Sequence, residues 1–185
     1  MEIVTYPDPI LNKPSRIITD EEIKQNVVEN VSLGQLISEM TTIMRQSQGA
    51  GISAIQVGVP VQLFLVDLPQ ASPLIFINAE LSNFTKPIEV SEGCLSFPGV
   101  KMSIKRPAAV HVSALNSKGV RFEMDADGLK ARVILHEWDH NCGRGFITRG
   151  NVTTNRRNLK LLADMEHNYI SWQKWQKHLK KTKGE

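Results

Sequence analysis

Apolar residues recur at helical spacing in three parts of the chain. In residues 32–48 they stand three or four positions apart, which predicts an amphipathic helix with Ser32 as its N-cap. Residues 126–143 predict a second helix that ends at Gly143, since glycine commonly stops a helix. Residues 155–180 predict a third helix. The chain is therefore expected to contain a helix near each end and one helix between them.

Short apolar runs between the first two predicted helices indicate β-strands. They lie at residues 61–68, 74–78, 87–93, 101–105, 108–115 and 120–124. The last two runs are separated by Asn-Ser-Lys-Gly, which is typical of a hairpin turn. Three prolines in the first fourteen residues, and the small residues at 49–54, predict irregular backbone in those segments. Because the strands are grouped, we expect an α+β fold with mainly antiparallel strands packed around the second helix.

Length and composition narrow the class of protein. The chain of 185 residues has 41% hydrophobic and 22% charged residues, which predicts one globular domain over 1–185, with a basic helix and tail from about residue 155. No apolar run approaches the roughly 20 residues of a membrane span, and no export signal is evident. A net charge of +3 and two cysteines argue against a nucleic-acid partner and a disulfide scaffold. We therefore expect a cytoplasmic protein with no membrane partner.

The clearest chemical signal is His-Glu-Trp-Asp-His at residues 136–140, the HExxH pattern. Histidines four residues apart lie on one side of a helix, so His136 and His140 can reach the same metal ion. Glu137 stands beside them and can accept a proton from a water molecule at the metal. The pattern falls within a segment that predicts a helix on other grounds. It therefore indicates a metal site.

Two histidines leave a site of the catalytic zinc type one protein ligand short. Four residues are candidates for the third ligand: Cys94, Cys142, Asp164 and Glu166. Either carboxylate, supplied by the last helix, would make the protein a zincin-like metallopeptidase. Cys142 comes two residues after His140 and is expected to point away from the metal. Cys94, taken alone, is better explained as a small buried apolar residue than as a metal ligand.

Three motifs occur together, in one order: Gly-Ala-Gly-Ile-Ser-Ala-Ile-Gln at 49–56, Glu-Gly-Cys-Leu-Ser at 92–96, and the HExxH pattern. This set closely resembles the peptide deformylase family, whose pattern is G-x-G-x-A-A-x-Q, E-G-C-L-S and Q-H-E-x-D-H. The resemblance extends from Tyr-Pro-Asp-Pro-Ile-Leu near the N-terminus to the metal helix. It implies a metal-dependent hydrolase that removes the N-formyl group from the N-terminal formyl-methionine of newly made polypeptides and releases formate.

The resemblance implies a role for each matching residue. Three residues would bind the metal: Cys94, His136 and His140. Three groups would act on the reacting amide: Glu137 as general base and acid, with Gln56 and the backbone N–H of Leu95 stabilising the oxyanion. The substrate peptide and its methionine side chain would contact Ala50, Gly51, Val90, Lys101, Leu129 and Val133. The metal ligands would be held in place by Glu92, Arg106 and Asp139.

The resemblance also implies a cofactor and partners. The cofactor would be one divalent metal ion, and the family usually holds Fe²⁺ in cells. A thiolate ligand suits Fe²⁺ as well as Zn²⁺, and Ni²⁺ or Co²⁺ are further alternatives. The partners would be N-formyl-methionyl peptides and nascent chains. The ribosome is a candidate partner, because the C-terminal helix of the family can dock on it and this chain is basic from Lys174 onward.

The chain departs from the family pattern at several positions. Ser53 replaces the first alanine of the A-A pair and adds a hydroxyl that needs a partner. Leu135 replaces the glutamine before the first metal histidine, and Asn141-Cys142 follows the second. Lys101 stands where many members carry arginine, so it keeps the charge but loses the bidentate geometry. A divergent paralogue that binds metal or formyl-peptide with little turnover is therefore an alternative to an active deformylase.

Overall fold

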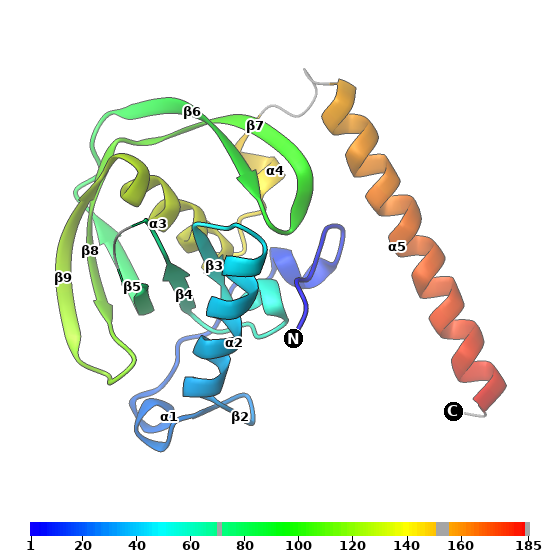
Figure 1. Cartoon of the computed structure of the whole chain (residues 1–185), viewed down its shortest axis with the longest axis horizontal. Coiled ribbons are helices and arrows are strands. Elements are labelled where there is room, and N and C mark those ends of the chain that lie inside the picture. Colours follow the sequence, from blue (N-terminus) through cyan, green and yellow to red (C-terminus); the bar gives the residue numbers. More distant parts are fainter. Residues whose placement is uncertain (70–71, 151–155, 184–185) are drawn as a thin grey trace.

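A five-stranded antiparallel sheet forms the centre of the protein (Figure 1). The structure, a computed structural model, describes residues 1–69, 72–150 and 156–183, with side chains as far as residue 176. The strand order is β3-β4-β5-β8-β9, and all neighbours are antiparallel. The strands are β3 (Gly51–Ser53), β4 (Leu63–Val66), β5 (Leu74–Ser82), β8 (Ala109–Leu115) and β9 (Arg121–Asp127).

Strand β4 is buried on both faces, because a helix covers each side of the sheet. Leu63 and Leu65 belong to the core shared with α2 (Leu33–Gln46). Phe64 and Val66 belong to the opposite core, which includes α3 (Gly128–Asn141). Successive strand residues point to opposite faces, so a strand covered on both sides must be apolar throughout. This arrangement explains the uninterrupted apolar run that the sequence shows there.

A long hairpin of β6 (Pro87–Cys94) and β7 (Phe97–Pro107) bends over α3 (Figure 1). Alternate residues of β7 are buried, and Val100, Met102 and Ile104 form a third core with Phe146 of α4 (Phe146–Arg149). Helix α5 (Arg156–Lys183) contacts β7 and adds Leu162 to this core. The hairpin is therefore held between α3 and α5.

The N-terminal region contains more structure than the sequence predicted. The proline-rich segment at the N-terminus contains a 3-10 turn, η1 (Pro9–Asn12). The short helix α1 (Asp20–Gln25) follows it. Helix α1 is too short for a periodic pattern, but Thr19 and Glu22 form a capping box at its start. The two-residue strands β1 (Val27–Val28) and β2 (Val31–Ser32) follow.

The α+β prediction is confirmed, and so are the three predicted helices and the β8–β9 hairpin. Ser32 caps α2 through its hydroxyl, and Gly143, with φ +68°, follows the end of α3. The prediction of irregular backbone at residues 49–54 was wrong, because β3 pairs with β4 there and η2 (Ala54–Val57) begins at its end. Small residues signalled a loop, whereas here they allow a strand to approach α3 closely.

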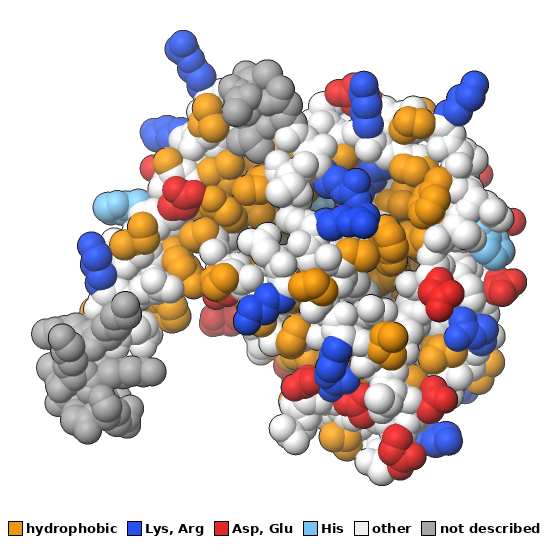
Figure 2. Space-filling view, turned by 180° about the vertical axis from the view of Figure 1, so that it is seen from behind, with side chains coloured by type: hydrophobic (Ala, Val, Ile, Leu, Met, Phe, Trp, Pro, Cys, Tyr) orange, Lys and Arg blue, Asp and Glu red, His pale blue; other side chains and the backbone are white. Residues whose placement is uncertain are grey.

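Helix α5 runs along one side of the molecule (Figure 1). It corresponds to the helix predicted at residues 155–180, of which residue 155 lies outside the described residues. Seen from behind, apolar side chains lie along α5 and over the adjoining surface (Figure 2). The large apolar side chains Ile170, Trp172 and Trp175 of α5 are exposed. The basic tail predicted beyond Lys174 has most of its side chains outside the described residues. Among the described helices, none has the length and apolar character needed to span a membrane.

Asn78 provides a test of how the sheet is joined to the N-terminal segment. It lies at an irregularity of β5 with φ +51°, donates to the carbonyl of Ile18 at 2.7 Å and accepts from its N–H at 2.9 Å. We expect Asn78→Ala to lower the free energy of unfolding by about 2 kcal/mol, because two hydrogen bonds are lost. The control is Asn83→Ala, since Asn83 has the same φ of +51° and is exposed. Equal losses in urea unfolding would show that only backbone strain matters.

Candidate active site

Three side chains that can bind a metal come together between the hairpin and α3. Cys94 ends β6, and His136 and His140 lie one turn apart on α3. Their ligand atoms all lie within 4.8 Å of one another, with 3.3 Å between Cys94 Sγ and His140 Nε2. Within the part of the chain that the structure describes, these three residues form a group of His and Cys side chains placed to hold one metal ion.

The donor set fits a divalent transition metal. One thiol and two imidazoles supply three protein ligands, the number that a catalytic site uses when it keeps a position open. Burial and the neighbouring His136 hold the pKa of His140 well below its ordinary value, so its ring is neutral, which is the form that binds metals. Both histidine side chains are buried, with His136 9% and His140 2% exposed.

The other candidates for the third ligand lie elsewhere. Cys142 is the C-cap of α3 and does not belong to the group of ligand atoms. Asp164 is exposed on α5. Glu166, also on α5, accepts a hydrogen bond from the hydroxyl of Tyr6. The structure therefore brings a thiol, and neither of these carboxylates, to the two histidines.

Glu137 and Gln56 lie beside the candidate metal ligands, both almost fully buried. Burial raises the pKa of Glu137 to about 6, although His136 and a hydrogen bond from Ser53 oppose this shift. The Gln56 side chain accepts from the backbone N–H of Ser53 at 2.9 Å and donates to Ser96 Oγ at 3.1 Å. Gln56 Nε2 is also 3.6 Å from Cys94 Sγ. The side-chain amide of Gln56 is thus held next to the candidate metal ligands.

A cleft of about 730 Å³ opens in front of these residues. Every residue predicted to contact the substrate lines it: Ala50, Gly51, Val90, Lys101, Leu129 and Val133. The lining also includes Gln56, Glu92, Cys94, Leu95, His136 and Glu137. His140, Arg106 and Asp139 do not line the cleft and are buried behind it.

Gly51 allows the wall of the cleft to lie close to the reacting groups. A Cβ atom added to Gly51 would lie 2.6 Å from both Glu137 Oε1 and Val133 Cγ1. No side chain fits there unless Glu137 moves. The glycine at this position is therefore required by the approach of β3 to α3 (Figure 1).

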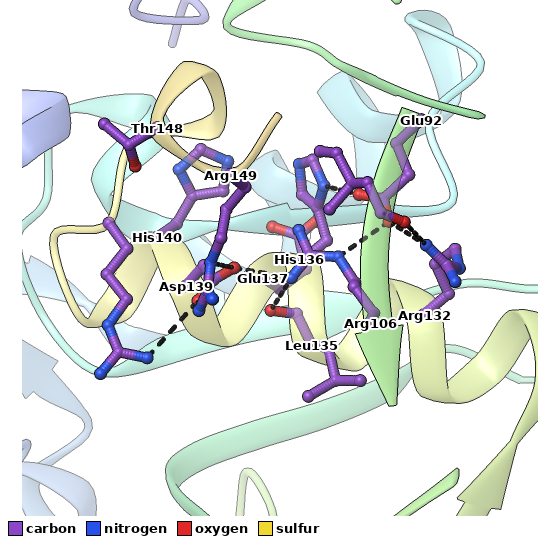
Figure 3. A network of polar contacts seen from close by, with 12 residues as sticks. Glu92, Arg106, Arg132, Leu135, His136, Glu137, Asp139, His140, Thr148 and Arg149 are labelled. Carbon is purple, nitrogen blue, oxygen red and sulfur yellow. Dashed lines mark hydrogen bonds and ion pairs between the residues drawn. The ribbon is translucent and has the colours of Figure 1, made fainter. Parts of the chain in front are cut away.

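The buried carboxylate of Glu92 joins the hairpin to α3 (Figure 3). It accepts from Arg106 Nε at 2.8 Å and Arg132 Nη1 at 2.6 Å, and it lies 3.0 Å from His136 Nδ1. Burial alone would raise the pKa of Glu92, but hydrogen bonds with His136 and Arg106 outweigh burial and bring it to about 2. Because the carboxylate is ionised, it can accept a hydrogen bond from the Nδ1–H of His136, which leaves Nε2 of His136 for a metal.

Asp139 forms the second half of the same network (Figure 3). It pairs with Arg106 Nη1 at 2.6 Å and with the guanidinium of Arg149, whose Nε lies at 2.8 Å. Arg106 also donates to the carbonyl of Leu135 at 3.2 Å, and the Leu135 side chain packs in the core below α3. Arg106, 4% exposed, thus bridges the two carboxylates.

Sequence reasoning missed Arg132 and Arg149. Arg132 precedes His136 by four residues in an apolar helix, so an inward-facing cation on the same side was a usable signal. Arg149 lies ten residues beyond Asp139, on α4. No pattern of spacing indicates that contact.

Comparisons of the sequence and of the structure with known proteins point to the same family. The sequence model described as polypeptide deformylase matches residues 1–156. A peptide deformylase of Clostridium botulinum is 41% identical over 144 residues, which cover 78% of this chain and 92% of that protein. A peptide deformylase of Aquifex aeolicus is 36% identical over 155 residues, covering 80% of this chain and 86% of the other.

Solved structures show the same fold. Peptide deformylase 1B of Arabidopsis thaliana, bound to an inhibitor, matches with a TM-score of 0.79 and 32% identity, covering 92% of this chain and 93% of that one. The Synechococcus elongatus peptide deformylase in complex with actinonin matches with a TM-score of 0.77 and 33% identity, covering 90% and 88%. The chain therefore belongs to the polypeptide deformylase family of metal-dependent hydrolases.

Proposed function

We propose that this protein is an active peptide deformylase, which hydrolyses the N-formyl amide of N-terminal formyl-methionine and releases formate. The observation that carries the proposal is the meeting of Cys94, His136 and His140 beside Glu137 and Gln56 at one cleft. The direct test is formate release from formyl-Met-Ala-Ser after anaerobic purification, with metal analysis of the same sample. A loaded protein that releases no formate would instead be a divergent binding paralogue.

Cys94, His136 and His140 would hold one divalent ion, with Fe²⁺ the resident metal in cells and Zn²⁺, Ni²⁺ or Co²⁺ as substitutes. When bound, the ion would supply a Lewis acid that polarises the formyl group and makes water acidic. The protein's own residues would control the ion through Glu92, which orients His136. Arg106 and Arg132 keep Glu92 ionised and in place.

Glu137 would accept the proton of the attacking water and later deliver it to the amine that leaves. A pKa near 6 suits both steps at neutral pH, because the group is mostly ionised and yet not a weak base. Negative charge would develop on the formyl oxygen. The Gln56 amide and the backbone N–H of Leu95 would donate hydrogen bonds to it.

The apolar part of the cleft would bind the methionine side chain. Val133 is 9% exposed, whereas Val90 and Leu129 are 41% and 61% exposed at the cleft. A formyl group has no side chain of its own, so selectivity must come from the methionine and the peptide beyond it. We propose nascent chains in the cytoplasm as the substrates, with the ribosome as a partner of the basic tail.

Glu137→Gln should retain the metal and lose nearly all formate release. The amide keeps the shape of the side chain but cannot accept the proton, so metal content and activity should separate. Metal analysis and steady-state kinetics of the same preparation provide the check. Activity within a few-fold of the parent would show that Glu137 is not the base.

Cys94→Ala should remove the metal, and Glu166→Ala should not. The reason is that Cys94 lies with the two histidines, whereas Glu166 is engaged by Tyr6 on α5. Cys142→Ala serves as a matched control, since it removes a thiol outside the ligand group. Retention of metal by Cys94→Ala together with loss in Glu166→Ala would favour a zincin-like metallopeptidase.

Lys101→Arg should lower KM for short formyl-Met peptides and leave kcat nearly unchanged. Lys101 is exposed in the wall of the cleft, and a guanidinium can grip a peptide group at two points where an ammonium grips one. The expected gain is about 1 kcal/mol in kcat/KM, typical of one added hydrogen bond. Kinetics on two- and three-residue substrates decide this, and an unchanged KM for both removes Lys101 from the site.

A further inference from the structure

Ser53 carries a hydroxyl at a position where the family pattern has alanine, and the structure gives this hydroxyl a specific partner. Ser53 ends β3 and is 0% exposed. Its Oγ donates toward the backbone carbonyl of Glu137 at 2.9 Å and lies 2.9 Å from Glu137 Oε2. It does not line the cleft, so it has no route to the substrate.

The two oxygens of the Glu137 carboxylate therefore have different surroundings. Oε2 is held by Ser53 on the buried side. Oε1 faces Gly51, where a Cβ atom would lie only 2.6 Å away, and Gly51 is part of the cleft wall. The torsion that turns a glutamate carboxylate is broad and roughly two-fold, so a packed helix alone does not set its angle. A hydrogen bond to one oxygen does.

We infer that Ser53 is a positioning residue, whose hydroxyl fixes the rotation of the Glu137 carboxylate so that Oε1 faces the reacting amide. The inference rests on the proposed function, because Glu137 acts there as the base. Ser53 also reaches the other polar group of the site, since its backbone N–H donates to Gln56 Oε1 at 2.9 Å. One residue at the end of β3 thus contacts both side chains that would meet the formyl group.

The contact can persist through a catalytic cycle. A hydroxyl can donate one hydrogen bond and can also accept hydrogen bonds. Ser53 Oγ lies near two oxygens, the backbone carbonyl oxygen and Oε2 of Glu137, so it can donate to only one of them at a time. When Glu137 is ionised, the hydroxyl can donate to Oε2. When Oε1 carries the proton taken on the side of the reacting amide, Oε2 is still an acceptor, so the same hydroxyl can continue to donate to it. Ser53 can therefore hold the carboxyl group in either condition without leaving a buried donor unpaired.

Ser53→Ala is the test, and alanine is the residue of the family pattern, so the change fits the backbone. We expect kcat to fall about tenfold, because a small misplacement of a catalytic group is costly, while KM and metal content stay within twofold. Ser53→Thr, which keeps the hydroxyl, should recover most of the loss. The control is Ser15→Ala, because Ser15 Oγ is buried without a hydrogen-bond partner among the described residues. Its kcat should equal that of the parent.

A kcat for Ser53→Ala within twofold of the parent would overturn the inference. So would a parallel loss of metal or rise in KM, which would mean that Ser53 supports the site as a whole. A crystal structure of Ser53→Ala should show the Glu137 carboxylate turned about its last bond, and an unchanged angle also counts against the inference. If the parent protein releases no formate, the proposed function fails by itself, and the carboxylate angle still decides the role of Ser53.

Discussion

The burial of the Glu92 carboxylate is the constraint on which the site depends. It belongs to a strand of the β6–β7 hairpin, and its partners Arg132 and His136 belong to α3. A carboxylate taken out of water is strongly unfavourable unless it is paired and fully hydrogen-bonded. The cations that compensate its charge are Arg106 and Arg132, and loss of both would leave the buried carboxylate without a counter-ion. The hairpin and the helix are thereby held in one relative position, which is the position that brings Cys94 to the two histidines.

The apolar cores provide the frame in which this polar network can be rigid. The sheet separates α2 from α3, and β4 contributes alternate residues to the cores on both faces. The third core, around Val100 and Met102, presses β7 against α5. Close packing leaves little freedom for the strands that carry the site. Arg106 can therefore reach Glu92 and Asp139 at once, without a flexible segment between them.

Much of the fold and site could be predicted from local patterns. The spacing of His136 and His140 places both on one face of a helix, and periodicity indicates that helix without any knowledge of the metal. Cys94 could not be assigned in this way, because a single cysteine forms no periodic pattern. Only its motif in combination with the two other motifs indicated that it binds a metal. Helix α1 and strand β3 were missed because six and three residues are too few to show a period.

Short motifs and periodic patterns in the sequence are sufficient to indicate the family, the α+β class, and the residue types that would bind metal and move a proton. Those properties depend on short motifs and on helical or strand periods, which are local. Only the folded arrangement establishes the partners of Glu92, the hydrogen bond between Tyr6 and Glu166, and the contact of Ser53 with a glutamate 84 positions away. Such contacts depend on how strands and helices pack. No pattern of spacing along the chain encodes that packing directly.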